Sequence, residues 1–352
     1  MAKDITYTNE KKYSISIAVW LADDLYDHAP VEGPYMSVTG LLKPIKQIIL
    51  GQRLKTLAVT TDIAEEIDID RWVASRLGTA IHSAIEHSWT RQAGKLKAYV
   101  IALQRLGYPP EVINLIQVNP TDEYLKANPK TIPVYMEQRA YKKILGYTIG
   151  GMYDFIGQGT LEDFKSMGSW GYMKGDKDYD FLMQGSMYKW LNPDKVTDTH
   201  MRIQQIITDW NKLDAQIKAK QNYPPNRIVE KVLKLKTPEE IEVWITDRLT
   251  QIISLKDTPE PDLPKCTQKE LWQDPPKYNY YGITKKGALS KVATKKFYED
   301  QAGAYAFMNN EKGGVGEVRE MSAKIKRCGY CDCRDICSDF AMYTAAGIVQ
   351  MP

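Results

Sequence analysis

Hydrophobic residues recur at helical spacing between residues 71 and 106 of the chain. The clearest run is Leu77, Ile81, Ile85 and Trp89, which recur every four positions. That period places the four side chains in one stripe along a helix, so the pattern predicts helix throughout this stretch. His82 and Glu86 would lie on the flank of the stripe. A shorter helix is predicted over residues 38–53, where apolar side chains follow similar spacing.

Residues 134–167 have a different pattern, in which β-branched and aromatic residues are interrupted by two short turn signals. The signals are Leu145-Gly146 and the Gly-Gln-Gly sequence at 157–159. Such punctuation predicts three antiparallel strands. The elements expected to follow are a helix over about 179–191, a strand over 201–210 and a helix over about 237–255.

The last of these helices has a well-formed start. Thr237 can cap it, a proline occupies the first helical position, and Glu240 stands three residues after the cap. A proline-rich segment at 256–265 then separates a region that holds all five cysteines. We therefore expect a first domain over residues 1–255 and a small cysteine-rich module over residues 266–352.

The turn at Gln158-Gly159 fixes an expected strand register. If these two residues form the hairpin loop, counting back along both strands places Asp154 opposite Asp163. Two like charges that face each other destabilise a sheet unless something positive lies between them. Lys165 is two residues beyond Asp163 and therefore points to the same face. The three side chains are expected to converge.

This trio suits phosphoryl chemistry. Two carboxylates can hold Mg²⁺ or Mn²⁺ with positions open for water and a phosphate oxygen. Lys165 can orient or help to deprotonate the attacking water, or offset the charge that develops on the phosphate. The alternative is that Asp163 and Lys165 are exposed strand residues and that Asp154 begins a turn. The hairpin alone favours that simpler alternative, because D-x-K is common by chance.

Composition limits this picture further. With 352 residues and 43% hydrophobic content, the chain can bury a large core. Lys and Arg number 47 against 44 Asp and Glu, so the formal charge of +3 neither favours nor excludes nucleic acid. No stretch reaches the roughly 18 apolar residues of a membrane span, and no export signal is recognisable. A cytoplasmic location without a membrane partner is expected.

Four segments in this order resemble the RecB-like branch of the PD-(D/E)XK nuclease superfamily. They are GTAIHSAIE at 78–86, GGMYDF at 150–155, LEDFKS at 161–166 and QGSMY at 184–188. The resemblance implies a metal ligand at His82, the two acidic residues at Asp154 and Asp163, and the lysine at Lys165. It assigns Gln184 and Tyr188, four apart on one helix face, to the substrate backbone or to positioning Lys165. Glu86 supports His82 or a second metal, or is a solvated helix residue; Glu137 is a weaker candidate.

The fold that the resemblance implies is α/β, with a PD-(D/E)XK nuclease core whose central mixed β-sheet is flanked by helices. The implied activity is hydrolysis of DNA, with cutting at ends favoured, in replication, recombination or DNA processing of a phage or mobile-element type. No G-x-x-x-x-G-K-[ST] loop is present, so a processive role would need a helicase or recombination partner. The competing hypotheses are a catalytically silent nucleic-acid-binding or assembly module and a nuclease directed at RNA.

The five cysteines are an odd number, which argues against a disulfide framework. Cys328, Cys331 and Cys337 have the spacing C-x2-C-x5-C, with Cys333 between them and Cys266 about sixty residues upstream. This resembles RecB-like nucleases that carry a [4Fe-4S] cluster, in which the lone cysteine generally precedes the nuclease motifs. Here it follows them, so a cluster would close the C-terminal module on itself.

Three interpretations of the cysteines remain, in this order: a [4Fe-4S] cluster on Cys266, Cys328, Cys331 and Cys337, a zinc site on four of the five, and thiols without metal. Either metal site would be structural. Within the same module, a lysine-rich stretch with two aromatic residues at 285–298 is expected to be helical. It could follow a phosphate backbone, although a solvated lysine face is the more common explanation.

Overall fold

The computed structural model describes residues 5–23, 31–60 and 65–351. The chain divides into two compact units, one formed by Met1–Leu42 and Asp62–Thr250 and the other by Lys43–Thr61 and Gln251–Pro352. The second unit holds all five cysteines together with helix α3 (Ile45–Thr60) from the N-terminal part of the chain. The cysteine region therefore includes a segment that precedes the nuclease-like motifs in the sequence.

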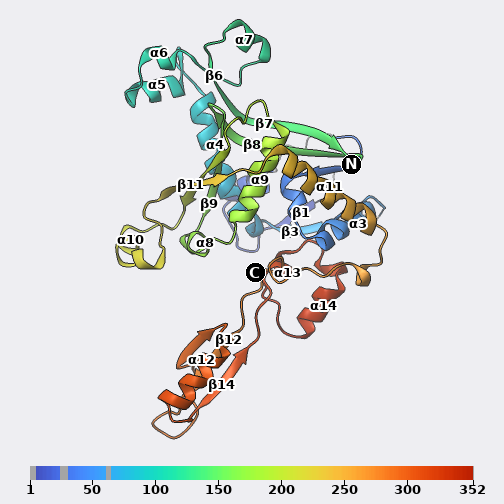
Figure 1. Cartoon of the computed structure of the whole chain (residues 1–352), viewed down its shortest axis with the longest axis vertical. Helices are drawn as coiled ribbons and strands as arrows, with labels where there is room; N and C mark the ends of the chain where they lie inside the picture. Colours follow the sequence, from blue (N-terminus) through green and yellow to red (C-terminus); the bar gives the residue numbers. More distant parts are fainter. Residues whose placement is uncertain (1–4, 24–30, 61–64, 352) are drawn as a thin grey trace. The chain divides into compact units, whose positions relative to one another are not determined.

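The first unit is a mixed α/β structure (Figure 1). Its strands are β1 (Ile5–Thr8), β2 (Tyr35–Ser37), β3 (Glu65–Asp68), β4 (Gln92–Ala93), β5 (Leu96–Lys97), β6 (Ile116–Val118), β7 (Ile132–Ile144), β8 (Tyr147–Gly157), β9 (Thr160–Met167), β10 (His200–Ile207) and β11 (Ile228–Lys234). Its helices are α1 (Ile15–Ala22), α2 (Val38–Leu41), α4 (Val73–Thr90), α5 (Ala98–Arg105), α6 (Pro110–Ile113), α7 (Asp122–Ala127), α8 (Ser169–Lys174), α9 (Asp178–Leu191), α10 (Lys212–Ile217) and most of α11 (Pro238–Leu255).

A seven-stranded mixed sheet organises this unit. Six strands follow the order β11-β10-β9-β8-β7-β6, and β2 pairs with β8. The β10–β9, β6–β7 and β2–β8 pairs are parallel, whereas the other neighbours are antiparallel. Helix α9 packs against the sheet through fully buried side chains such as Met183, Met187 and Trp190. The mixed sheet flanked by helices agrees with the expected fold class at this level of detail.

Several predicted elements are confirmed. The three strands expected over 134–167 are β7, β8 and β9, and their turns place Leu145 and Gln158 at positive φ, each followed by a glycine that also has positive φ. Helix α9 and strand β10 lie where the sequence predicts them. Helix α11 begins with the expected reciprocal cap, because the Thr237 amide donates to the Glu240 carboxylate at 2.8 Å and the Glu240 amide donates to the Thr237 hydroxyl at 3.2 Å.

Three helix predictions need correction. The helix expected throughout 71–106 ends at Thr90, and a short hairpin of β4 and β5 turns at Gly94, whose φ is +65°, before α5 begins. The helix expected over 38–53 is two helices, α2 and α3, separated at Pro44 because the residue before a proline is disfavoured in helical conformation. The lysine-rich stretch at 285–298 is not helical; it is a loop followed by a strand.

The second unit contains strands β12 (Lys277–Tyr281), β13 (Lys295–Tyr298) and β14 (Glu317–Met321) and helices α3, α12 (Gln301–Ala306), α13 (Arg327–Tyr330) and α14 (Ser338–Ala345). Its core joins Ile49 and Leu50 of α3 to Leu263 and Cys333. Leu263 belongs to the proline-rich segment at 256–265, so this segment packs on the core. In the described part of the chain, no helix is both long and apolar enough to cross a membrane.

Candidate metal centre

A row of acidic residues crosses three neighbouring strands. The hairpin register is as predicted, with Gly157 opposite Thr160 and Phe155 opposite Glu162. These pairs end at Phe155 and Glu162, and the next residues along the two strands are Asp154 of β8 and Asp163 of β9. On the other side of β8, Met136 pairs with Phe155 and Gln138 pairs with Tyr153. Glu137 of β7 therefore lies level with Asp154. The tertiary structure thus extends the predicted pair of carboxylates to three.

Local backbone geometry opens the sheet at this row. Glu137 has a φ of +49°, an uncommon conformation for a residue that is not glycine, and its pairing with Asp154 is missing from an otherwise continuous ladder. Before Asp154, the fully buried residues Ile149 and Tyr153 of β8 have odd numbers, whereas Ile156 after it has an even number. The alternation of side chains between the two faces of the sheet therefore shifts by one residue at Asp154. The Asp154 Oδ2 atom accepts a hydrogen bond from the Phe164 amide at 2.7 Å, which ties the carboxylate between the two strands.

His82 enters the site from helix α4. Its Nε2 atom lies 2.8 Å from the Phe164 carbonyl oxygen, and its Nδ1 atom lies 3.5 Å from Asp154 Oδ1. Because a carbonyl can only accept, Nε2 carries a proton. In the neutral ring Nδ1 then has a free lone pair that faces Asp154. A backbone carbonyl that fixes the second ring nitrogen is the usual arrangement around a metal-binding histidine.

Three side chains can meet at one ion. His82, Glu137 and Asp154 each offer one ligand atom, and these atoms lie within 4.8 Å of one another. Burial and the nearby charge of Asp154 raise the pKa of Glu137 to about 7, and the Glu86 charge adds to that effect. Hydrogen bonding to Asp154 raises the pKa of His82. A divalent cation would relieve the repulsion between these buried carboxylates.

Asp163 is held separately by polar side chains. It is 1% exposed, and its Oδ2 atom lies 2.7 Å from the Nζ atom of Lys165. Its Oδ1 atom accepts a hydrogen bond from the Gln184 amide at 3.4 Å, and the same amide donates to the Tyr188 hydroxyl at 2.9 Å. Although Lys165 opposes the effect, burial and the charge of Asp154 raise the pKa of Asp163 to about 6.

The sequence-derived residues therefore take distinct places. His82 and Asp154 belong to the three-ligand group, whereas Asp163 and Lys165 form an ion pair beside it. Gln184 donates to both Asp163 and the Tyr188 hydroxyl, and Tyr188 is only 5% exposed. Glu137 occupies the third ligand position, which the sequence had ranked low. The signal that points to Glu137 is its register opposite Asp154, which counting back from the two-residue turn at Leu145-Gly146 also gives, since Ile144 pairs with Tyr147 and the register continues unchanged along both strands.

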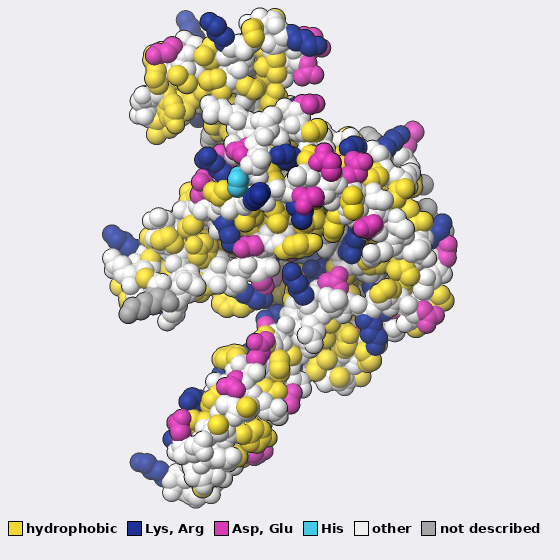
Figure 2. Space-filling model, viewed as in Figure 1, with side chains coloured by type: hydrophobic (Ala, Val, Ile, Leu, Met, Phe, Trp, Pro, Cys, Tyr) yellow, Lys and Arg dark blue, Asp and Glu magenta, His cyan; other side chains and the backbone are white. Residues whose placement is uncertain are grey.

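A cavity of about 100 Å³ adjoins Lys165. Lys177, Phe181 and Gln205 also line it, together with the glycines at both ends of the segment 171–175. Lys165 therefore contacts the Asp163 carboxylate and also lines a cavity to which Lys177 contributes a second lysine. On the face of the molecule that Figure 2 shows, basic and acidic side chains are interspersed, so the positive charge available to a ligand is local.

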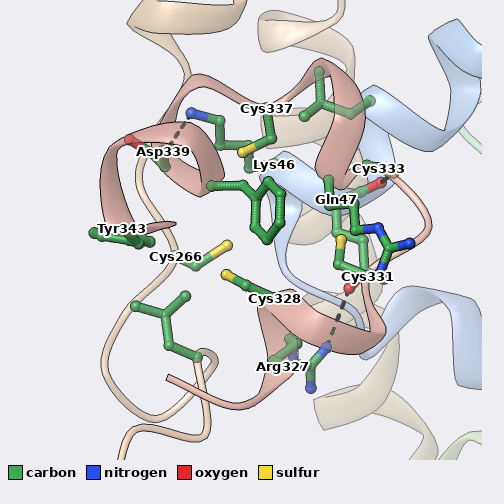
Figure 3. Close-up of a pocket in the computed structure, with 14 residues that line it drawn as sticks. Lys46, Gln47, Cys266, Arg327, Cys328, Cys331, Cys333, Cys337, Asp339 and Tyr343 are labelled. Carbon is green, nitrogen blue, oxygen red and sulfur yellow. Dashed lines mark hydrogen bonds and ion pairs between the residues drawn. The ribbon is translucent and has the colours of Figure 1, made fainter. Parts of the chain in front are cut away.

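The five cysteines line one pocket in the second unit (Figure 3). The sulfur atoms of Cys266 and Cys328 point toward each other in this view. Cys333 is 3% exposed in the core, with its Sγ atom 3.5 Å from the Gln47 carbonyl oxygen, and a hydrogen bond between its thiol and that of Cys331 lowers the pKa of Cys331. Burial raises the pKa of Cys266 to about 12 and that of Cys328 to about 11.

No protein-family model matches the sequence, and no curated protein matches it. Among solved structures, the chain is similar to a protein designated SSO0001, with 17% identity and a TM-score of 0.37 over 71% of this chain and 90% of that chain. It is also similar to a phage-related exonuclease from Haemophilus somnus 129PT, with 11% identity and a TM-score of 0.25 over 51% of this chain and 80% of that chain. Superpositions at this level carry no argument about activity.

Proposed function

We propose that this protein is a metal-dependent nuclease that hydrolyses phosphodiester bonds in DNA, with cutting at ends favoured. One observation carries the proposal: ligand atoms of His82, Glu137 and Asp154 converge within 4.8 Å, beside the ion pair of Asp163 and Lys165. One imidazole and two carboxylates suit Mg²⁺ or Mn²⁺. The choice of DNA as substrate rests on the motif resemblance in the sequence.

The residues have different tasks in this proposal. His82, Glu137 and Asp154 would hold the ion, which when bound polarises a phosphate oxygen and lowers the pKa of water. Lys165 can donate to a phosphate oxygen from its place between Asp163 and the adjoining cavity. Asp163 fixes the position of Lys165 through their ion pair. Gln184 holds the Asp163 carboxylate, and the Tyr188 hydroxyl holds Gln184, which favours a positioning role over direct contact with substrate.

The test uses purified full-length protein with linear and circular DNA in Mg²⁺, Mn²⁺ or chelator. We expect cleavage of linear DNA that chelator abolishes, with circular DNA resistant. Asp154→Asn, Asp163→Ala and Lys165→Ala should each remove cleavage while the circular dichroism spectrum is retained. Cleavage of circular DNA would show that the protein cuts within the strand and does not need an end. Full activity of Asp163→Ala would contradict the assignment of Asp163 to the active site.

A matched control comes from the same strand. Glu162 lies next to Asp163 on β9, and its carboxylate accepts a hydrogen bond from Gln204 at 3.1 Å instead of facing the site. Glu162→Gln removes one carboxylate and should leave cleavage within about twofold, since surface changes away from a site have small effects. DNA binding without cleavage by the wild-type protein would favour the silent binding module, and selective cleavage of RNA would favour the RNA-directed alternative.

The pocket of cysteines would hold a second, structural metal group. Four thiolates at Cys266, Cys328, Cys331 and Cys337 suit a [4Fe-4S] cluster or zinc. The motif resemblance in the sequence favours the cluster, and the pocket that the five cysteines line suits either metal group.

Iron and acid-labile sulfide analysis after oxygen-free purification tests this assignment. We expect brown protein with iron and sulfide, loss of both in Cys337→Ala, and retention of both in Cys333→Ala. The two variants are matched, because each removes one thiol from the same pocket. One zinc and no iron would favour the zinc site, and loss of metal in Cys333→Ala alone would show that the ligand set is wrong.

A further inference from the structure

The three-stranded sheet of the second unit has two unlike faces. The strand order is β13-β12-β14, so β12 is central. One face is closed, because Phe307, directly after helix α12, packs against Tyr280 of β12 and Phe297 of β13 with ring centroids 5.2 and 5.6 Å apart. Tyr280 is 2% exposed and Phe307 is 9% exposed. This closed face is the small core that holds the sheet together.

The alternation of side chains places a different set of residues on the opposite face. We call this set the open face, and its three rows across the strands are Tyr298, Lys277 and Met321; Lys296, Asn279 and Arg319; and Tyr281 and Glu317. Tyr298 is 60% exposed and Met321 is 44% exposed. The open face therefore presents aromatic and cationic side chains to solvent on a flat, regular support.

Charge and ring geometry on the open face suit a polyanion that carries rings. The face has three cationic side chains and one carboxylate, a balance of +2. Lys277 Nζ lies 5.4 Å from the Tyr298 ring centroid, and the Arg319 guanidinium lies 5.0 Å from that of Tyr281. In the central row, the Oδ1 atom of Asn279 is buried without a hydrogen-bond partner, and the residue is 8% exposed. An acceptor left in this state can gain a donor when a ligand rearranges the side chains around it.

We infer that the open face binds single-stranded DNA. Tyr298 and Tyr281 lie two rows apart, about 13 Å along the strands, and each ring can stack on a base while Lys296 and Arg319 between them contact phosphates. A duplex would hide the faces of its bases and could use only the cations. The inference rests on the proposed function for its choice of DNA, but it concerns binding and not cleavage.

Fluorescence anisotropy with full-length protein tests the inference, using labelled oligothymidine, a hairpin duplex and oligouridine in chelator. We expect tightest binding to oligothymidine. Tyr298→Ala and Tyr281→Ala should each weaken it about tenfold, as expected for loss of one stacked base, whereas Tyr298→Phe keeps the ring and stays near wild type. Lys296→Gln should reduce the slope of log affinity against log salt by about 0.7. Glu317→Gln should tighten binding, because it releases Arg319 from its ion pair.

The matched control is Tyr305→Ala. Tyr305 belongs to α12, on the closed side, and is 44% exposed, so its loss should leave affinity unchanged. Unchanged affinity in the Tyr281→Ala, Tyr298→Ala double variant would overturn the inference, and so would equal or tighter binding of the duplex or of oligouridine. If the wild type binds through these rings but cuts no DNA, the proposed nuclease fails and the inference stands. If the wild type cuts DNA while the double variant binds oligothymidine normally, the inference fails and the proposed nuclease stands.

Discussion

Glu137 and Asp154 lie opposite each other on β7 and β8, at the position where the pairing of these strands is interrupted. In a continuous ladder, two facing carboxylates would repel and destabilise the sheet. The positive φ of Glu137 instead turns its side chain so that one oxygen comes within 4.8 Å of ligand atoms on Asp154 and His82. The strained backbone at this point therefore belongs to the group of side chains proposed to hold the cation.

Removal of the Glu137 charge should weaken metal binding and leave the protein folded. Glu137→Gln is expected to lower Mn²⁺ affinity by more than about tenfold, since the loss of a supporting residue alone costs about 10- to 100-fold. Isothermal titration calorimetry measures the affinity, and Glu162→Gln on strand β9 of the same sheet is the control. Unchanged Mn²⁺ affinity in Glu137→Gln would remove this residue from the ligand set.

Metal affinity should depend on pH in a defined direction. The pKa values of Glu137 and Asp163 are raised to about 7 and about 6, mainly by burial, and the pKa of His82 is raised by Asp154. Protons therefore compete with the cation below about pH 7, and Mn²⁺ affinity should fall as pH decreases toward about 5. Calorimetry across this pH range in wild type and Glu137→Gln tests whether Glu137 causes the pH dependence. The variant should no longer show the decrease in Mn²⁺ affinity near pH 7. A flat profile in the wild type would contradict the prediction.

Tyr188→Phe tests whether Tyr188 positions Gln184. The substitution removes the hydroxyl that Gln184 contacts at 2.9 Å and leaves the buried ring in place. We expect kcat to fall while Mn²⁺ affinity and KM stay near wild type, because a small displacement of Asp163 misplaces Lys165; a shift of about 1 Å can cost on the order of a hundredfold. Kinetics and metal titration on one preparation distinguish this role from substrate holding, in which KM would rise, and from simple packing, in which activity would not change.

Lys46 should be the main electrostatic support of the second unit. It is 2% exposed and contacts Glu260 at 2.8 Å and Asp339 at 2.7 Å. Although burial lowers the pKa of Lys46, hydrogen bonds to Asp339 and Glu260 raise it to about 12. Lys46→Met leaves two carboxylates facing each other and should cost about 3–5 kcal/mol.

Denaturant unfolding measures that loss, with Lys256→Met as control. Lys256 is mostly exposed and its nearest carboxylate contact is 3.9 Å long, so its replacement should change the free energy of unfolding by less than about 0.5 kcal/mol. A similar small change in Lys46→Met would show that the buried ion pairs contribute little to the stability of the second unit.

Local sequence determined the pieces that carry the site. A glycine in a two-residue turn and the period-two alternation of strands fix the hairpin register, because one step of slippage would turn every side chain to the other face. This is why the hairpin pairing that leads to Asp154 and Asp163 could be predicted. The cap at Thr237 and the extent of helix α9 were predictable for the same reason: each depends on residues a few positions apart.

Tertiary structure decided what those pieces contact. The Leu145-Gly146 turn already places Glu137 opposite Asp154, but a local pattern encodes neither the positive φ of Glu137 nor the approach of His82 from helix α4. Asp163 binds Lys165 and Gln184 and lies outside the three-ligand group, because burial makes an unpaired carboxylate costly. Helix α3 joins the cysteine region through contacts between residues more than two hundred positions apart. Sequence periodicity specifies which face of an element is buried; only the packed structure specifies the partner.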